Sequence, residues 1–395
     1  MRRLARIGTV AAIGTGLGLM GCAGNPSGRT MPGDDATGET VRSSSSTNKR
    51  PDTSSQTKRD AGAPLDLVTT QAEPVKGNDA WCGTMQLCWN NIIDKELGGN
   101  PVVFSDDAYN TEEVAHLNAK LFNTGDVSDD HYYTYAGDMT SKAKEEIKQA
   151  ISEKFGQDSD ILDSFTGWDQ GGQFLYAMLY RQFSFVAPFA ISDGSDLFGS
   201  TSNENKAEGV AYFEADSDEQ RSQVTPLYYE DYAHHAVRLE TADGDELVLV
   251  SSPQGSTLDE IWQNAMERAA NAESNAIKPL DKKETFRCPN LDINLLHDSY
   301  AWVGPKFNNG WYITQAMQTL KLHLDNEGGE VKSEAGIAMT KSADMDMDEK
   351  PARSFVYNDT FALFVRDGNA GNDAYPYVGV LVSDITQFQS GAEKV

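Results

Sequence analysis

Cysteine and histidine are the residue types in this chain most able to do covalent chemistry. Cys82 and Cys88 lie six residues apart in the segment CGTMQLCW, residues 82–89. A cysteine becomes a nucleophile when a neighbouring histidine takes its proton. The histidines that the fold would have to bring there are His234, His235, His297 and His323. The residue types therefore allow a cysteine peptidase, and buried structural cysteines are the ordinary alternative.

The spacing of this segment argues against the peptidase. Papain-like enzymes place their nucleophile in a Cys-Gly-Ser-Cys-Trp setting. Here five residues separate Cys82 from Cys88, and no histidine lies in a recognisable catalytic context. We therefore expect structural cysteines and no enzyme activity.

The adjacent pair His234-His235 raises the question of a metal site. Neighbouring residues in a strand point to opposite faces, and no second histidine pair or cysteine accompanies them. A structural role is favoured, and the sequence indicates no metal and no cofactor. If Cys22 carries a lipid, three cysteines remain, and an odd number of cysteines cannot all be paired in disulfides. Cys82 and Cys88 can pair only if the helix begins after Cys82.

The first 22 residues are typical of a bacterial lipoprotein signal peptide. Arg2, Arg3 and Arg6 precede an apolar stretch, and Leu-Met-Gly-Cys at residues 19–22 resembles the lipoprotein cleavage box. Cys22 would carry the lipid and anchor the protein to the bacterial cell surface or outer membrane. A membrane-spanning anchor and a plain secreted protein are the alternatives, but the apolar stretch is short for a spanning helix.

Composition divides the rest of the chain into a tether and a domain. Residues 23–77 are rich in Ser, Thr, Gly, Asp, Lys and Pro and are expected to be disordered. Residues 78–390 have the length of one domain. The formal net charge of −27 argues against binding to nucleic acid or to anionic lipid surfaces. A monomer is expected.

The most informative elements lie near the C-terminus. Residues 329–339 alternate, with Val331, Ser333 and Ala335 on one face and charged residues on the other, as in a half-buried strand. Residues 340–354 contain many charged side chains, which predicts an exposed loop. Residues 355–366 are aromatic and aliphatic and predict a second strand. A long acidic loop therefore joins two strands.

Elsewhere the patterns predict helices and strands in alternation. Helical spacing covers residues 81–97, 141–155 and 258–272. An apolar run at 174–180 predicts a strand buried on both faces. Further strands are predicted at 210–213, 227–229, 236–239 and 247–250, with a hairpin turn at Asp243-Gly244.

Several of these segments, taken in order, resemble the serpin family. Residues 324–329 look like the acidic strand end and glycine before the serpin reactive loop, and residues 333–340 look like its hinge. Residues 355–367 and 378–382 are similar to the strands that follow the loop, with Thr360 and Val380 replacing the family proline and arginine. Further resemblances are to serpin strands, at 100–105, 117–122, 174–180 and 288–293, with Ala177 in place of the family asparagine.

The resemblance implies an α+β, serpin-like fold. It would have large, mostly antiparallel sheets, packed helices, an exposed reactive-type loop and a reduced set of N-terminal helices, because about fifty residues expected after residue 105 are missing. The hinge residues would be Gly328, Gly329, Ser333, Glu334, Ala335, Gly336, Ile337 and Ala338, and the reactive loop would hold Lys341, Ser342, Ala343, Asp344, Met345, Asp346 and Met347. Aligning Gly328 places the cleaved bond near Ser342, and aligning Ser333 places it nearer Asp346.

The function that the resemblance implies is inhibition of a serine or cysteine peptidase. Lys341 would suit a trypsin-like target, and Met345 or Met347 a chymotrypsin- or elastase-like one. A non-inhibitory serpin-fold binding protein is the rival hypothesis. Lys332 and Ile337 in the hinge, the missing helices, and the departures at Ala177, Thr360 and Val380 favour this rival.

Overall fold

A computed structural model describes residues 64–75, 77–192, 197–199, 205–331, 352–371 and 373–395. The chain divides into Met1–Gln56, which lies outside the described residues, and Thr57–Val395, which contains every element named below. The predicted signal peptide, Cys22 and the reactive-loop residues 341–347 also lie outside them.

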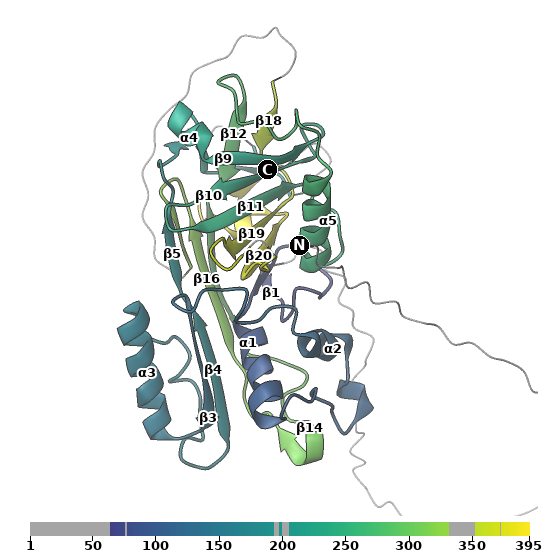
Figure 1. Cartoon of the computed structure of the whole chain (residues 1–395), viewed down its shortest axis with the longest axis vertical. Coiled ribbons are helices and arrows are strands. Elements are labelled where there is room, and N and C mark those ends of the chain that lie inside the picture. Colours follow the sequence, from purple (N-terminus) through teal and green to yellow (C-terminus); the bar gives the residue numbers. More distant parts are fainter. Residues whose placement is uncertain (1–63, 76, 193–196, 200–204, 332–351, 372) are drawn as a thin grey trace, which may run out of the picture. The chain divides into compact units, whose positions relative to one another are not determined.

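The largest sheet has seven strands and forms the core of the unit (Figure 1). Its order is β1 (Asp66–Leu67), β2 (Asp79–Cys82), β20 (Val378–Val382), β19 (Phe361–Asp367), β11 (Asp245–Ser251), β10 (His235–Glu240) and β9 (Val224–Tyr229). Every residue of β19 and β20 is buried, so these two strands are the centre of the core. The predicted turn at Asp243-Gly244 is confirmed, and Gly244 takes the positive φ of 89° that such a turn favours.

Helix α5 (Leu258–Ala270) packs on this sheet and confirms a predicted helix. Thr257 caps it by accepting a hydrogen bond from the Glu260 N–H. Its apolar stripe is buried, and Trp262 lies 5.3 Å from the ring of Phe364 on β19.

A second, four-stranded sheet has the order β13 (Leu291–His297), β16 (Gln318–Leu324), β17 (Gly328–Val331) and β5 (Arg181–Ser184). A separate antiparallel pair, β3 (Tyr132–Asp138) and β4 (Gln173–Leu179), leads directly into β5. Helix α3 (Ser141–Phe155) and helix α1 (Thr84–Asn91) lie on either side of this pair (Figure 1). The predicted helix 141–155 is confirmed, with Thr140 as its N-cap and Gly156 ending it at a φ of 66°.

The third sheet and the small pairs complete the unit. The sheet has the order β18 (Ser354–Val356), β12 (Thr285–Pro289), β8 (Tyr212–Glu214) and β6 (Ala190–Ile191). The pairs are β14 (Lys306–Phe307) with β15 (Trp311–Tyr312), and β21 (Glu393–Lys394) with β7 (Ala207–Glu208). The remaining helices are α2 (Glu112–Ala119), α4 (Asp218–Ser222), the π-helix Ile92–Glu96 and three 3-10 turns at Asp107–Tyr109, Asn308–Gly310 and Ile385–Gln387.

Two strands predicted from the family resemblance are wrong. Residues 100–105 form no strand, and Phe104 makes only an isolated bridge to Phe307. The strand that pairs with β20 is β2, about twenty residues earlier. Residues 117–122 mostly belong to or follow helix α2, which Lys120 ends in a left-handed conformation.

Other predicted boundaries of helices and strands also differ from those in the structure. Trp81 and Cys82 lie in β2, so the helix predicted over 81–97 begins at Thr84. Residues 288–293 are split between β12 and β13, in different sheets. Strand β1 and the buried side chains of Leu67 and Val68 lie inside the segment predicted as a tether, so this end of it is ordered.

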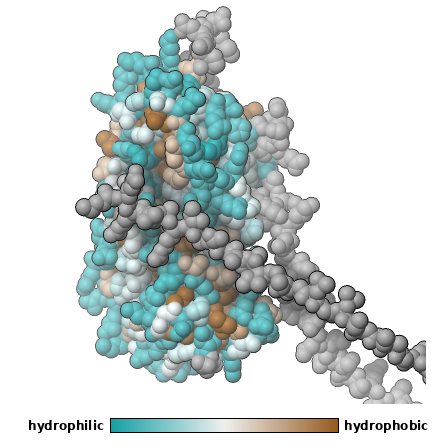
Figure 2. Space-filling view, turned by 45° about the vertical axis from the view of Figure 1, so that its right-hand side comes forward, coloured by the Kyte–Doolittle hydropathy of each residue, from teal (hydrophilic) through white to brown (hydrophobic). Residues whose placement is uncertain are grey.

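Strand β4 confirms the predicted strand at 174–180, but not its burial on both faces. Leu175, Ala177 and Met178 remain half-buried. Figure 2 shows hydrophilic residues over most of the face that it presents, which suits the acidic composition. Within the described residues, no helix has the length and apolar character needed to cross a membrane.

Candidate functional site

The feature that distinguishes the second sheet is strand β17, which lies between β16 and β5. It pairs antiparallel with β16 on one edge and antiparallel with β5 on the other. Residues 325–327 form the turn that reverses the chain after β16, and the Phe185 N–H donates to the Glu327 carbonyl at 2.9 Å. The chain therefore enters the sheet as a new strand at Gly328 and leaves the described residues immediately after Val331.

Two glycines make this entry possible. A Cβ on Gly328 would lie 2.3 Å from the Phe183 carbonyl oxygen and 2.7 Å from the Ser184 Cα, and the φ of 148° favours glycine. A Cβ on Gly329 would lie 2.5 Å from the Phe183 ring and 2.7 Å from the His323 carbonyl oxygen. Only residues without a side chain fit between β16 and β5 here.

Beyond Val331, β16 and the strand β4 that precedes β5 run on with no described strand between them. Strand β4 pairs with β3 on one edge, and its other edge has no partner among the described strands. Residues Gln318–Leu322 of β16 pair only with β13 in the same part of the structure. The space between these two edges is a cavity of about 580 Å³, and Val331 lies at its end. We call this cavity, bounded by β4, β16 and Val331, the slot.

The slot has an inner and an outer side because side chains alternate along its strands. Leu175 on β4 packs with the cluster that includes Met85 and Trp89 of α1, so this side faces the core. Phe174 and Tyr176 pack with the cluster that includes α3. Val331 is 5% exposed and belongs to the main core, so the last described residue of β17 points to the inner side.

Polar contacts hold β17 and its turn on the outer side. The Tyr180 hydroxyl, at the junction of β4 and β5, donates to Glu330 Oε1 at 3.0 Å. Burial and the neighbouring carboxylate raise the pKa of Tyr180 to about 12, so it stays a donor. His323 on β16 contacts Asp292 at 2.6 Å and Asp325, in the turn, at 3.0 Å. These two carboxylates raise the pKa of His323 to about 10, so it is charged at neutral pH.

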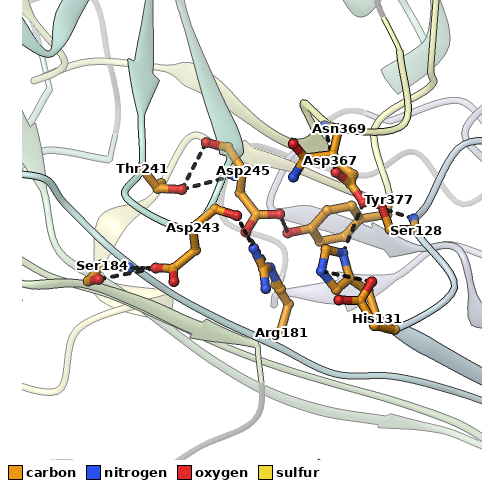
Figure 3. A network of polar contacts seen from close by, with 11 residues as sticks. Ser128, His131, Arg181, Ser184, Thr241, Asp243, Asp245, Asp367, Asn369 and Tyr377 are labelled. Carbon is orange, nitrogen blue, oxygen red and sulfur yellow. Dashed lines mark hydrogen bonds and ion pairs between the residues drawn. The ribbon is translucent and has the colours of Figure 1, made fainter.

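A buried polar network fastens β5 to the seven-stranded sheet (Figure 3). Arg181, which lies opposite Val331, donates to the fully buried Asp245 on β11. The Tyr377 hydroxyl donates to the other oxygen of Asp245 at 2.9 Å. Burial raises the pKa of Asp245, and Arg181 opposes that rise. The buried ion pair therefore holds the edge of the slot at β5.

The same network anchors the start of β3. His131 Nδ1 lies 2.9 Å from Asp367 Oδ2, and the Ser128 N–H donates to that oxygen at 2.8 Å (Figure 3). Burial alone would raise the pKa of Asp367, but the hydrogen bonds from His131 and Ser128 outweigh it and hold the pKa well below its usual range. The network therefore ties both the start of β3 and Arg181 to the core.

The described chain resumes at Ala352, and the next residue, Arg353, is held in place by several hydrogen bonds. Its guanidinium donates to both oxygens of Glu284 at 2.6 and 2.7 Å and to the Ala276 carbonyl at 2.6 Å. Both side chains of this ion pair are at most 15% exposed. The segment 332–351 therefore starts at the slot and ends at a fixed point beside β18.

Of the predicted hinge residues, the structure describes Gly328 and Gly329, and it brings both into the entry to the slot. The hinge residues 333–338 and all of the reactive-loop residues lie outside the described part of the chain, and their roles stay predictions. The contacts made by Tyr180, Arg181, His323 and Arg353 were not predicted from the sequence. Their partners are mostly distant in sequence, so no local pattern announced them.

The described cysteines and histidines do not form a catalytic pair. Cys82, Cys88 and Cys288 are all free thiols, so Cys82 and Cys88 are not bridged. Burial raises the pKa of Cys88 to about 12, the opposite of what a nucleophile needs. His234 contacts Asp231, and His235 is buried against the rings of Tyr229, Phe355 and Tyr357. No cluster of potential metal ligands occurs among the residues described.

Comparison with known proteins gives structural likenesses only. No family model matches the chain, and no curated protein matches its sequence. A serpin from the trematode Schistosoma haematobium shares 12% identity over 78% of this chain and 93% of its own, with a TM-score of 0.40. The mouse protein-Z dependent protease inhibitor shares 10% identity over 78% and 91%, with a TM-score of 0.43.

Thyroxine-binding globulin in complex with thyroxine shares 13% identity and a TM-score of 0.37. The match covers 61% of this chain and 64% of the globulin, which is less than two thirds of its length. The chain resembles serpins in structure. Each of these TM-scores is below 0.5, so the function has to be inferred from the strand pairing and the slot.

Proposed function

We propose that this protein is a serpin-like peptidase inhibitor, held at the bacterial surface by a lipid on Cys22, whose bait loop lies near residues 340–348. The nucleophile of a serine or cysteine peptidase attacks a peptide bond of the loop, the new amino terminus leaves, and the loop stays joined to the peptidase as an ester or thioester. The segment after Val331 then enters the slot as a new strand before water can hydrolyse that bond. The carrying observation is that β17 already lies between β16 and β5 and is antiparallel to both. A strand continuing from Val331 would be antiparallel to both free edges of the slot and would complete their hydrogen bonding.

The register supports this mechanism. Gly328 pairs with Ser184 and Val331 with Arg181, so an unbroken continuation would set Ser333 opposite Leu179 and Met339 opposite Gln173. The segment 332–339 would thus run the whole length of β4. Because residues alternate, Ser333, Ala335 and Ile337 would follow Val331 to the inner side. Their side chains are small or apolar, as that cavity requires.

Peptidase specificity follows from the loop sequence. Lys341 suits a trypsin-like peptidase, and Met345 or Met347 a chymotrypsin- or elastase-like one. Arg353 is a poor bait because its guanidinium is held by Glu284 and by backbone carbonyls.

The test is incubation of the protein with trypsin-, chymotrypsin-, elastase- and subtilisin-like peptidases, read by denaturing gels and mass spectrometry. A covalent complex with a cut between Thr340 and Asp348 is expected. Ser333→Arg should abolish the complex, because insertion would bury an unpaired charge at a cost of several kcal/mol. Ser333→Ala is the matched control and should retain it. An unchanged complex with Ser333→Arg would rule out insertion as the mechanism.

The second candidate is a non-inhibitory surface protein that uses the same fold to bind a ligand. The observation that favours it is the slot itself, a largely apolar cavity between β4 and β16. Cleavage of the loop without a covalent complex and without a rise in thermal stability would favour this candidate.

A further inference from the structure

The slot has the properties of a small-molecule site. Its volume of about 580 Å³ lies in the range of about 300 to 1,000 Å³ that is usual for ligand pockets. It is bounded on several sides, by β4, by β16, by helix α1 and by the segment 310–317 that leads into β16. Apolar side chains on its walls, such as Leu175, Ala177 and Met317, are only partly buried.

The walls are adaptable as well as apolar. Four of the five methionines among the described residues line the slot: Met85, Met139, Met178 and Met317. Methionine is unbranched and polarizable, so methionine-rich walls adjust to ligands of different shape. The rings of Trp89 and Trp302, 5.2 Å apart, lie at the same cavity.

Charge selects the kind of ligand. The charged side chains among the lining residues are Glu96, Asp160 and Lys321, and Asp160 and Lys321 pair with each other at 2.9 Å. An anion in the slot would therefore meet no unpaired cation on the described walls. The acidic chain as a whole also repels anions.

We propose that the slot binds an uncharged, mainly apolar small molecule of about the size of a drug or a steroid. The binding site stands on the cavity alone.

The experiment is titration of the full-length protein with the neutral dye Nile red, followed by fluorescence and equilibrium dialysis. We expect saturable binding of one dye per chain, and little competition from the anionic dye ANS. Ala177→Phe and Ala316→Phe add rings to opposite walls of the slot and should each weaken binding by about tenfold or more. Ala270→Phe, at the exposed end of helix α5 and outside the lining, is the matched control and should bind as the wild type does.

Thermal melts establish that each variant is folded, and two wall variants are used so that a folding failure in one leaves the other informative. Absence of saturable binding, or equal binding by both folded wall variants and the wild type, would overturn the site.

Discussion

Replacement of Gly328 by alanine tests whether the entry of β17 into the sheet depends on a missing side chain. The new Cβ would lie 2.3 Å from the Phe183 carbonyl oxygen and 2.7 Å from the Ser184 Cα. Both atoms belong to the backbone of β5, so no side-chain rotation relieves the contact. Strand β5 itself is held by the Arg181–Asp245 ion pair, so it cannot easily move away.

The magnitude has two parts. A non-glycine residue at a φ of 148° costs about 1 to 3 kcal/mol of backbone strain. The steric contact adds to this strain. The total cannot exceed the free energy lost when the four paired residues of β17 leave the sheet, because detachment relieves both the strain and the contact. The matched control is Gly371→Ala, because Gly371 has a φ of 115° with nothing within 4 Å of its Cβ position, so it measures strain alone.

Hydrogen–deuterium exchange measured by mass spectrometry reads the effect directly. We expect faster exchange in peptides that cover Arg181–Ser184 and Gly328–Val331 in Gly328→Ala, and no such change in Gly371→Ala. Urea unfolding should show a larger loss of stability for Gly328→Ala than for the control. Wild-type exchange in both peptides of a folded Gly328→Ala protein would refute the conclusion that glycine is required at this entry.

Two further changes probe the outer side of the slot. Tyr180→Phe removes the hydroxyl that donates to Glu330 and should lower the free energy of unfolding by about 0.5 to 1.5 kcal/mol, with faster exchange in the β17 peptide; equal exchange would contradict a role in holding β17. For His323, the folded pKa of about 10 exceeds the ordinary 6.5, so its contact with Asp292 and Asp325 stabilises the fold fully below pH 6.5. That contribution should disappear as the pH rises through about 10, and His323→Gln should flatten the decline of the urea midpoint; a decline identical to wild type would contradict the assignment.

Local sequence predicts the elements whose causes are local. Helix α3 was predictable because its apolar stripe, its Thr140 cap and its terminal Gly156 all lie within one short segment. Strands β9, β10, β11 and β19 of the large sheet were predictable from apolar runs and from the turn at Gly244. The family resemblance fails at residues 100–105, which form no strand, and the strand beside β20 is β2.

The site depends on contacts between distant segments, and so sequence analysis found only part of it. The sequence predicts a hinge at Gly328 and Gly329, but it does not show that both lie in close contact with the backbones of β16 and β5. The partners of Arg181 and Tyr180 lie 64 and 150 residues away. Those pairings exist because the sheets bring the residues together.

The sequence by itself determined most of the helices and strands, the acidic character of the chain and the alternating residue pattern after Gly328. These follow from side-chain period, turn residues and charge, which act over a few positions. The tertiary structure alone decided that β17 enters between β16 and β5 and that a cavity lies between β4 and β16. A cavity between two strands is a property of their packing, and no single stretch of sequence encodes it.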